Sequence, residues 1–213
     1  CPASVAFAAD GSRTSILGYS EQLCGQKVFG AEDFWYSGNL IPLSHPGLKA
    51  ETRARIQKMV TVLTREYGLK GLNGIDFLLL PQGQILFLEI NPRYCASMEL
   101  YWLAYGIDIF QLHLEGSLGT LPSENFLANE KRQDKKYWGK AIVYAREDIR
   151  TGDTSGWFEQ GVRDIPSDGQ YLPQGSPLCS VFARASSRAD CFTQLYRQQA
   201  YVLSRVIPVH TKM

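Results

Sequence analysis

The chain has 213 residues, of which 45% are hydrophobic and 20% are charged, and its 22 basic and 21 acidic side chains nearly balance. Such a chain can bury a real core, and its charge does not predict a face for nucleic acid. No apolar run approaches the length of a membrane span, and the start lacks the charged and apolar segments of a signal peptide. We therefore expect a folded protein without nucleic-acid or membrane partners.

Cysteine and histidine usage argues against a zinc or redox protein. The five cysteines are scattered and none forms a Cys-x-x-Cys pair, while the three histidines are too far apart to form a ligand cluster. Widely spaced cysteines favour a reducing compartment, so we expect a cytoplasmic location. The first residue is Cys1 rather than Met, and we expect the chain to be part of a longer protein.

The first elements in chain order are a predicted hairpin and a predicted helix. Alternating residues predict the hairpin over 4–18. Apolar residues at three- and four-residue spacing predict the helix over about 48–67, which Gly68 would end as a cap. Between them, residues 36–39 contain a glycine and are typical either of a loop that approaches a ligand or of a solvent-exposed turn.

A second hairpin is predicted from two apolar runs, 74–80 and 85–91, which are joined by Pro81-Gln82-Gly83-Gln84. Proline and glycine at this point favour a tight turn. In the simplest register Leu80 faces Ile85. Facing residue numbers would then sum to 165 along the whole hairpin.

This register places Asp76 directly opposite Glu89, and Asn91 shares the face of Glu89 because side chains alternate along a strand. Like charges in facing positions destabilise a sheet unless a cation lies between them. Mg²⁺ fits, since it prefers one or two carboxylates with phosphate and water oxygens. The alternative is that both acids face solvent on a half-exposed hairpin. A Ca²⁺ site would need about six or more oxygens, which this apolar segment does not offer.

After the hairpin, a helical segment is expected over 98–105, and Asp108 is a good N-cap for a helix that ends near 116–119. His113 lies in this apolar helix and is expected to be packed and hydrogen-bonded. Cys95 is interpreted as a small buried thiol in preference to a nucleophile.

The remaining residues predict a separate C-terminal domain. The charged, proline-containing stretch 121–136 is typical of a linker or exposed loop. Residues 137–213 then predict a small β-rich domain, with a strand over 137–145, short strands toward 177–183 and a final helix over about 187–206.

The hairpin also carries an arginine, Arg93, directly after the proposed ligands, and arginine binds phosphate or carboxylate in two-point geometry. The runs Gly71-Leu72-Asn73-Gly74-Ile75-Asp76-Phe77 and Leu88-Glu89-Ile90-Asn91-Pro92-Arg93 resemble the metal-binding hairpin of the ATP-grasp superfamily. That superfamily includes D-alanine–D-alanine ligase, biotin carboxylase and carbamoyl phosphate synthetase. The interval of thirteen residues between the two acids (89 − 76) is the one found in the D-alanine ligases.

The resemblance implies an α+β fold, in which residues 1–120 form the C-terminal lobe of an ATP-grasp domain with an antiparallel sheet and packed helices. Asp76, Glu89 and Asn91 would hold Mg²⁺ (or Mn²⁺) against the phosphates of ATP, and Arg93 would steady the transferring phosphoryl group. The implied activity is an ATP-dependent ligase that forms an acyl phosphate from a carboxylate for attack by an amine. The alternative is a non-catalytic nucleotide-binding or scaffold module.

Two departures from the family pattern refine this expectation. In carboxylases of the superfamily a glutamate follows the arginine at a set distance, whereas here Ser97 has that place and Glu99 comes two residues late. This favours small-molecule carboxylate and amine substrates over bicarbonate. The chain also lacks the glycine-rich loop that covers the phosphates in the family, so we expect weak or no turnover by this chain alone. The sequence is compatible with a homo-oligomer but does not predict an oligomeric state.

Overall fold

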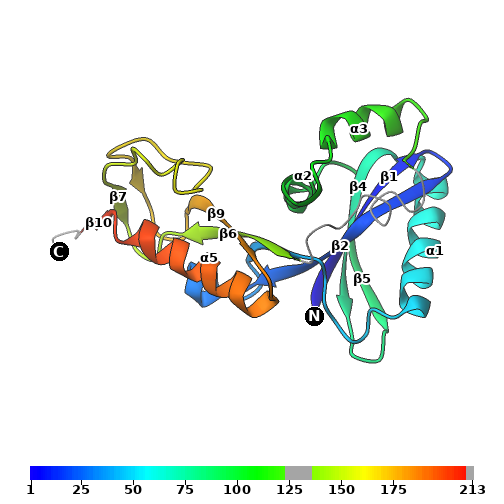
Figure 1. The fold of residues 1–213 in the computed structure, drawn as a ribbon, viewed down its shortest axis with the longest axis horizontal. Helices are drawn as coiled ribbons and strands as arrows, with labels where there is room; N and C mark the ends of the chain where they lie inside the picture. Colours follow the sequence, from blue (N-terminus) through cyan, green and yellow to red (C-terminus); the bar gives the residue numbers. More distant parts are fainter. Residues whose placement is uncertain (123–135, 210–213) are drawn as a thin grey trace. The chain divides into compact units, whose positions relative to one another are not determined.

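A computed structural model describes residues 1–122 and 136–209, and within it the chain forms two compact units (Figure 1). The first unit is Cys1–Gln22 with Ile41–Lys135, and the second is Leu23–Leu40 with Lys136–Met213. The predicted α+β class is confirmed, with antiparallel strands and packed helices. None of the described helices is both long and apolar enough to cross a membrane.

The first unit is built on four strands in the order β5-β4-β1-β2, and each neighbouring pair is antiparallel. The strands are β1 (Pro2–Asp10), β2 (Thr14–Cys24), β4 (Lys70–Leu79) and β5 (Ile85–Asn91). Both predicted hairpins are therefore present. The predicted helix is α1 (Ala50–Tyr67), and Gly68 ends it in the left-handed conformation, as expected.

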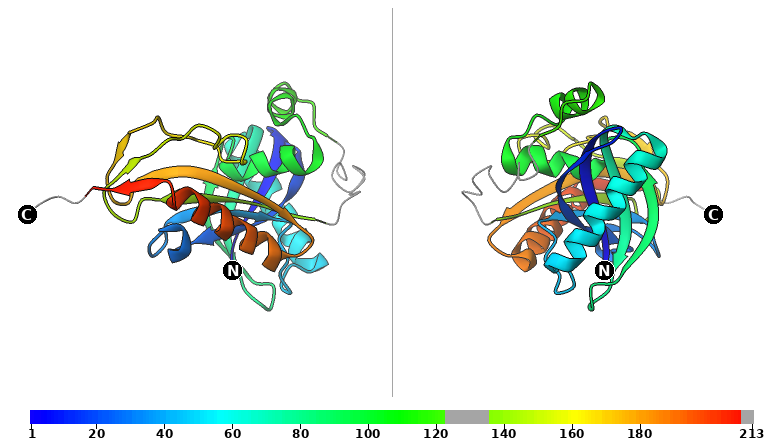
Figure 2. Two further views of the ribbon diagram at one scale, coloured as in Figure 1. Left: turned by 60° about the vertical axis from the view of Figure 1, so that its left-hand side comes forward. Right: turned by 90° about the vertical axis from the view of Figure 1, so that its right-hand side faces the viewer.

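Helices lie on both faces of these four strands (Figure 1 and Figure 2). Val5 and Phe77 point to the face covered by α1, where they share a buried core with Ile56. The opposite face carries Gly18, and a Cβ there would lie 2.5 Å from the ring of Tyr101. That tyrosine belongs to α2 (Glu99–Tyr105), which follows a short 3-10 turn, η2 (Ala96–Met98).

Helix α3 (Ile109–Ser117) is fixed to the sheet by the histidine that the sequence singled out. Asp108 caps the helix, and its side chain accepts a hydrogen bond from the backbone N–H of Gln111 at 2.9 Å. The Nδ1 atom of His113 accepts from the backbone N–H of Leu72 at 3.1 Å. Both expectations are confirmed, and the histidine has a structural partner.

The second unit pairs strands in the order β3-β6-β9 and has a smaller sheet in the order β10-β7-β8. Its elements are η1 (Lys27–Phe29), β3 (Tyr36–Ile41), β6 (Tyr137–Tyr144), β7 (Ile149–Thr151), β8 (Tyr171–Leu172), β9 (Pro177–Ala185), α5 (Arg188–Leu203) and β10 (Val206–Pro208). The final helix is shorter than predicted, because Val206 already belongs to a strand.

This unit differs from the predicted β-rich domain of residues 137–213, because it also contains Leu23–Leu40. Leu23, Phe29 and Leu40 complete its buried core, so the C-terminal segment does not close a core without them. The predicted linker over 121–136 falls almost wholly outside the described residues.

Residues 36–39 form part of β3, so neither a loop nor a solvent-exposed turn is present there. Gly38 has a φ of 136°, and a Cβ there would lie 2.0 Å from the carbonyl oxygen of Lys140. Glycine is needed here because a neighbouring strand, rather than a ligand, approaches the backbone.

Candidate functional site

The two acids of the second hairpin face each other as predicted. Asp76 on β4 pairs with Glu89 on β5, and two residues further along Gly74 pairs with Asn91. Asp76 is half-buried, whereas Glu89 is exposed. The alternative of two solvent-facing acids therefore holds for Glu89 alone.

The register near the turn differs from the simplest ladder. Leu79 rather than Leu80 faces Ile85, and the pairing shifts by one residue between Asp76 and Phe77. Leu88 is the extra residue on β5, and so forms a β-bulge. The bulge brings the predicted carboxylate pair into register although the predicted turn pairing is wrong.

The amide of Asn91 lies between the two carboxylates. Its Nδ2 donates to Oε1 of Glu89 at 3.1 Å and, at a longer 3.4 Å, to Oδ2 of Asp76. Its Oδ1 accepts from Nη2 of Arg93 at 3.1 Å. The four residues named from the sequence are thus linked by hydrogen bonds into one cluster.

Burial raises the pKa of Asp76 to about 6, and the neighbouring Glu89 adds to the shift through its charge and a shared hydrogen bond. Hydrogen bonds from Gln22 and Asn91 oppose it. A carboxyl with this pKa has a destabilised ionised form, which a cation in contact with its oxygens would favour.

Gln22 on β2 is a member of the cluster that the sequence did not indicate. A hydrogen bond from its side chain is one of the influences that lower the pKa of Asp76. More than fifty residues separate the two positions, and only the order of the strands β4-β1-β2 brings them together. No local motif carries this information.

Arg93 and Cys95 complete the surroundings of the cluster. Arg93 also donates through Nη1 to the carbonyl oxygen of Tyr94 at 3.1 Å, so its guanidinium is folded along its own loop. The thiol of Cys95 donates to the carbonyl oxygen of Arg93 at 3.4 Å, and burial raises its pKa to about 11. A thiol that stays protonated near neutral pH is a poor nucleophile, which agrees with the preferred interpretation of this cysteine.

The strand β5 is more exposed than its apolar sequence predicts. It is an outer strand of the first unit's sheet, and Leu86, Phe87 and Leu88 are 51%, 47% and 53% exposed. Hydrophobicity predicted the strand but could not show that, within residues 1–122 and 136–209, no strand pairs with its other side.

The cluster suits a hard cation that is shared with phosphates. Among the described residues, no group of three or more His, Cys, Asp or Glu side chains could hold a metal by itself. Both carboxylates nevertheless accept hydrogen bonds from the amide nitrogen of Asn91, and a cation would bind the same carboxylate oxygens. Mg²⁺ typically uses one or two carboxylates and completes its shell with water and phosphate oxygens, so the residues present fit it.

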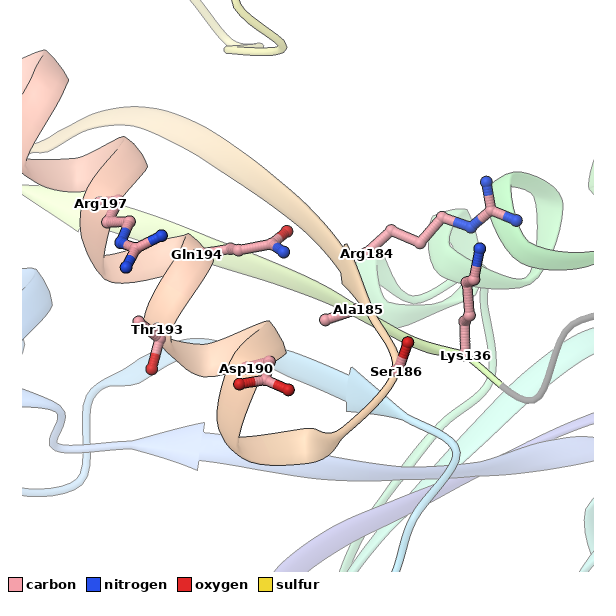
Figure 3. A pocket seen from close by; sticks show the side chains of 8 residues that line it. All are labelled: Lys136, Arg184, Ala185, Ser186, Asp190, Thr193, Gln194 and Arg197. Carbon is pink, nitrogen blue, oxygen red and sulfur yellow. The ribbon is translucent and has the colours of Figure 1, made fainter.

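A separate hollow of about 520 Å³ lies in the second unit beside α5 and the end of β9 (Figure 3). Lys136, Arg184 and Arg197 line it, with Asp190 as the one acid. The oxygens of Asp190 are engaged at the start of the helix, where Oδ2 lies 2.7 Å from Oγ of Ser187. This hollow has no facing carboxylates and is not part of the candidate site.

Comparison with known proteins gives a match over the segment that holds the cluster. Residues 1–97 match the family described as the ATP-grasp domain. No curated protein sequence matches the chain.

Solved structures extend the likeness to nearly the whole chain at low sequence identity. The biotin carboxylase domain of a single-chain bacterial carboxylase is 19% identical, with a TM-score of 0.67 over 96% of this chain and 47% of its own. An L-amino acid ligase from Bacillus licheniformis is 16% identical, with a TM-score of 0.67 over 99% of this chain and 54% of its own. N5-carboxyaminoimidazole ribonucleotide synthetase from Thermotoga maritima is 14% identical, with a TM-score of 0.64 over 98% and 52%.

The chain therefore spans about half the length of these solved chains, and only 12% of the larger urea amidolyase from K. lactis. Identities this low establish a shared fold. Together with the match over residues 1–97, they confirm the resemblance stated from the hairpin. Residues 1–97 thus match the ATP-grasp domain family, and nearly the whole chain shares the fold of these solved structures.

Proposed function

We propose that the protein is an ATP-dependent ligase that activates a small-molecule carboxylate and transfers the acyl group to an amine. The observation that carries this proposal is the facing pair Asp76 and Glu89, joined through the amide of Asn91. ATP-grasp ligases and carboxylases among the solved structures of this fold support a carboxylate-activating reaction.

In the proposed reaction, a carboxylate oxygen of the substrate attacks the γ-phosphorus of ATP, and the bond to ADP breaks. The product is an acyl phosphate. The amine then attacks its carbonyl carbon, and phosphate leaves with one oxygen of the original carboxylate. The amine loses a proton in this step, so the net products are an amide, ADP and phosphate.

Asp76, Glu89 and Asn91 are the residues that would hold Mg²⁺. When bound there, the cation would supply charge stabilisation for the phosphates during phosphoryl transfer. Nη2 of Arg93 lies 3.1 Å from Oδ1 of Asn91, so the guanidinium lies beside one of the proposed metal ligands. We assign to it the role of binding the transferring phosphoryl group, which carries negative charge on several oxygens.

The oxygen balance of this reaction gives a direct test. One structural relative is an L-amino acid ligase, so a panel of amino acids labelled with ¹⁸O in the carboxylate is a suitable first probe. We expect ADP release with one amino-acid pair or more, and one ¹⁸O atom in the phosphate. Turnover that yields only unlabelled phosphate would contradict an acyl phosphate.

Substitutions separate the enzyme from the alternative of a non-catalytic nucleotide-binding or scaffold module. Loss of one electrostatic contact to the reacting phosphates costs about 10²–10³-fold in kcat. We expect Glu89→Gln to show a loss of this size, while Glu66→Gln, which changes an exposed acid on α1, leaves kcat unchanged. If Mn²⁺-dependent ATP binding survives both Asp76→Asn and Glu89→Gln, the proposed role of the hairpin is wrong.

A further inference from the structure

We propose that the hollow beside α5 in the second unit binds a small phosphate compound that carries more than one negative charge. Every residue that lines the hollow belongs to the second unit and none belongs to the hairpin cluster, so this inference goes beyond the proposed function. Its basis is the gathering of three cationic side chains, those of Lys136, Arg184 and Arg197, around one hollow of about 520 Å³ (Figure 3).

The pairing of β6 with β9 explains how two of these cations come to line the same hollow. Arg184 on β9 pairs with Trp138 on β6, and Lys136 lies two residues before Trp138, just ahead of the strand. Residues two apart in an extended chain share a face, and Figure 3 shows the side chains of Lys136 and Arg184 extending in the same direction. Like charges placed together on a sheet repel each other, and a bound anion would offset this repulsion.

The guanidinium of Arg184 is held by an aromatic ring. Its Cζ atom lies 5.1 Å from the centroid of the Trp138 ring, in a cation–π contact. This contact uses the flat face of the guanidinium, whereas its N–H groups point outward within the plane. An arginine oriented in this way presents the planar fork that matches two oxygens of a phosphate group.

Helix α5 supplies the third cation and a neutral donor. Arg197 and Gln194 are exposed, and their spacing of three residues places them on one face of the helix. Asp190, the one acid of the lining, belongs to the helix cap: its backbone N–H donates to Oγ of Ser187 at 3.0 Å, and its Oδ2 lies 2.7 Å from the same atom. Three cations and one acid leave the lining with two more positive charges than negative charges.

The size and the lining of the hollow indicate the class of ligand. Its volume lies within the range of small-molecule pockets, which is about 300–1,000 Å³. Seven of the eight residues that line it are polar or charged, and the exception is Ala185. Pockets for cofactors are mostly apolar and aromatic, and this lining offers no ring on which a nucleobase could stack. A compact diphosphate therefore suits the hollow better than ATP does.

Calorimetric titration of the protein with inorganic pyrophosphate tests this proposal. A chelator is present, so that no metal ion can hold pyrophosphate at the hairpin. We expect one binding site per chain. Arg184→Gln and Arg197→Gln should each raise the dissociation constant about tenfold or more, the usual effect of losing one hydrogen bond to a charged group. The matched control Arg55→Gln removes the same charge from an exposed position of α1 and should leave the dissociation constant unchanged.

Four results would overturn the proposal. The first is the absence of binding at millimolar pyrophosphate. The second is an equal loss for Arg55→Gln, which would show a general attraction of the anion to positive charge. The third is loss of binding in Arg93→Gln but not in Arg184→Gln, which would place the anion at the hairpin and leave the proposed function standing. The fourth is equally tight binding of malonate, which would make the hollow a carboxylate site.

Thermal unfolding separates a lost contact from a damaged fold. Arg184→Gln also removes the contact with Trp138, so its Tm should be compared with that of Arg197→Gln, which changes an exposed side chain. A Tm within about 2 °C of the unsubstituted protein shows that the fold is retained. If Arg184→Gln unfolds earlier than this, Arg197→Gln alone decides the outcome.

Discussion

The surroundings of Asp76 in the folded chain disfavour the ionised form of its carboxyl group. Burial and the nearby Glu89 raise the pKa of its carboxyl from 3.8 to about 6. The folded state therefore binds the proton more tightly than the unfolded state. The stability contributed by the protonated form is complete below about pH 4 and is lost as the pH rises through about 6.

This linkage predicts the behaviour of Asp76→Asn without metal. The asparagine side chain does not ionise, so the variant does not lose stability as the pH rises. Its Tm should exceed that of the unsubstituted protein by about 2–4 °C above pH 7 and should equal it near pH 4. Thermal unfolding in the presence of a chelator measures this difference. A Tm difference that stays constant between pH 4 and 7 would contradict the linkage.

Gly74 makes room for the thiol of Cys95 beside the carboxylates. A Cβ at Gly74 would lie 2.6 Å from Sγ of Cys95, so we expect Gly74→Ala to lower the free energy of unfolding by about 1–3 kcal/mol, as overpacked sites do. Cys95→Ala in the same chain should restore most of the loss. Denaturant unfolding of the single and double variants checks this, and an unrescued loss would place the strain elsewhere.

At this scale the sequence could predict Asp76, Glu89, Asn91 and Arg93 because all four lie on one hairpin and its exit. Local alternation determines which of them share a face. Gln22 could not be predicted, because its position depends on a third strand far away in the chain. The assignment of all these residues to metal and phosphate stays a prediction.

Among the elements, α3 has a side-chain hydrogen bond to β4. The Nδ1 atom of His113 is the partner of the Leu72 N–H, and His113→Leu would leave that donor without it. We expect the free energy of unfolding to fall by about 1–3 kcal/mol, the cost of an unsatisfied backbone donor. Phe110→Leu, at a position 72% exposed on the same helix, should change it by about 0.5 kcal/mol or less.

Urea unfolding of both variants provides the measurement. Equal losses for His113→Leu and Phe110→Leu would show that the histidine contact contributes nothing specific. A larger loss that leaves Mn²⁺ affinity unchanged would agree with a structural role for His113 and with its exclusion from the site.

The best-predicted elements are those in which apolar residues repeat with one spacing throughout, namely α1 and the two hairpins of the first unit. Errors occurred where a tertiary neighbour decides the conformation. Residues 36–39 became a strand because β6 approaches Gly38, and the end of α5 gave way to β10 because Val206 pairs with Thr151. Neither partner is adjacent in the sequence.

For the whole molecule, the shared core of the second unit is the feature that the sequence concealed. Leu23–Leu40 belongs to it although it lies far from Lys136–Met213 in the chain. Composition located a boundary near residue 121, but a contact between distant segments leaves no compositional trace. The cytoplasmic location stays a prediction from the sequence, which predicts no particular oligomeric state.

The chain spans about half the length of the solved ATP-grasp chains. Electrostatic stabilisation of phosphates depends on excluding water, which screens charges strongly. We therefore expect residues 1–213 alone to release ADP from Mg²⁺-ATP at least about 10²-fold more slowly than any longer form that contains them. A coupled ADP assay measures both, and equal rates would show that this chain holds the complete catalytic apparatus.

The bulge at Leu88 also affects how such sites should be searched for in other sequences. Near the turn, Leu78 faces Leu86, so an uninterrupted ladder would place residue 88 opposite Asp76. A hairpin without the extra residue would thus need an interval of twelve between its acids (88 − 76), where this one needs thirteen. A search pattern restricted to one interval would miss homologues with the same spatial arrangement, and both lengths should be accepted.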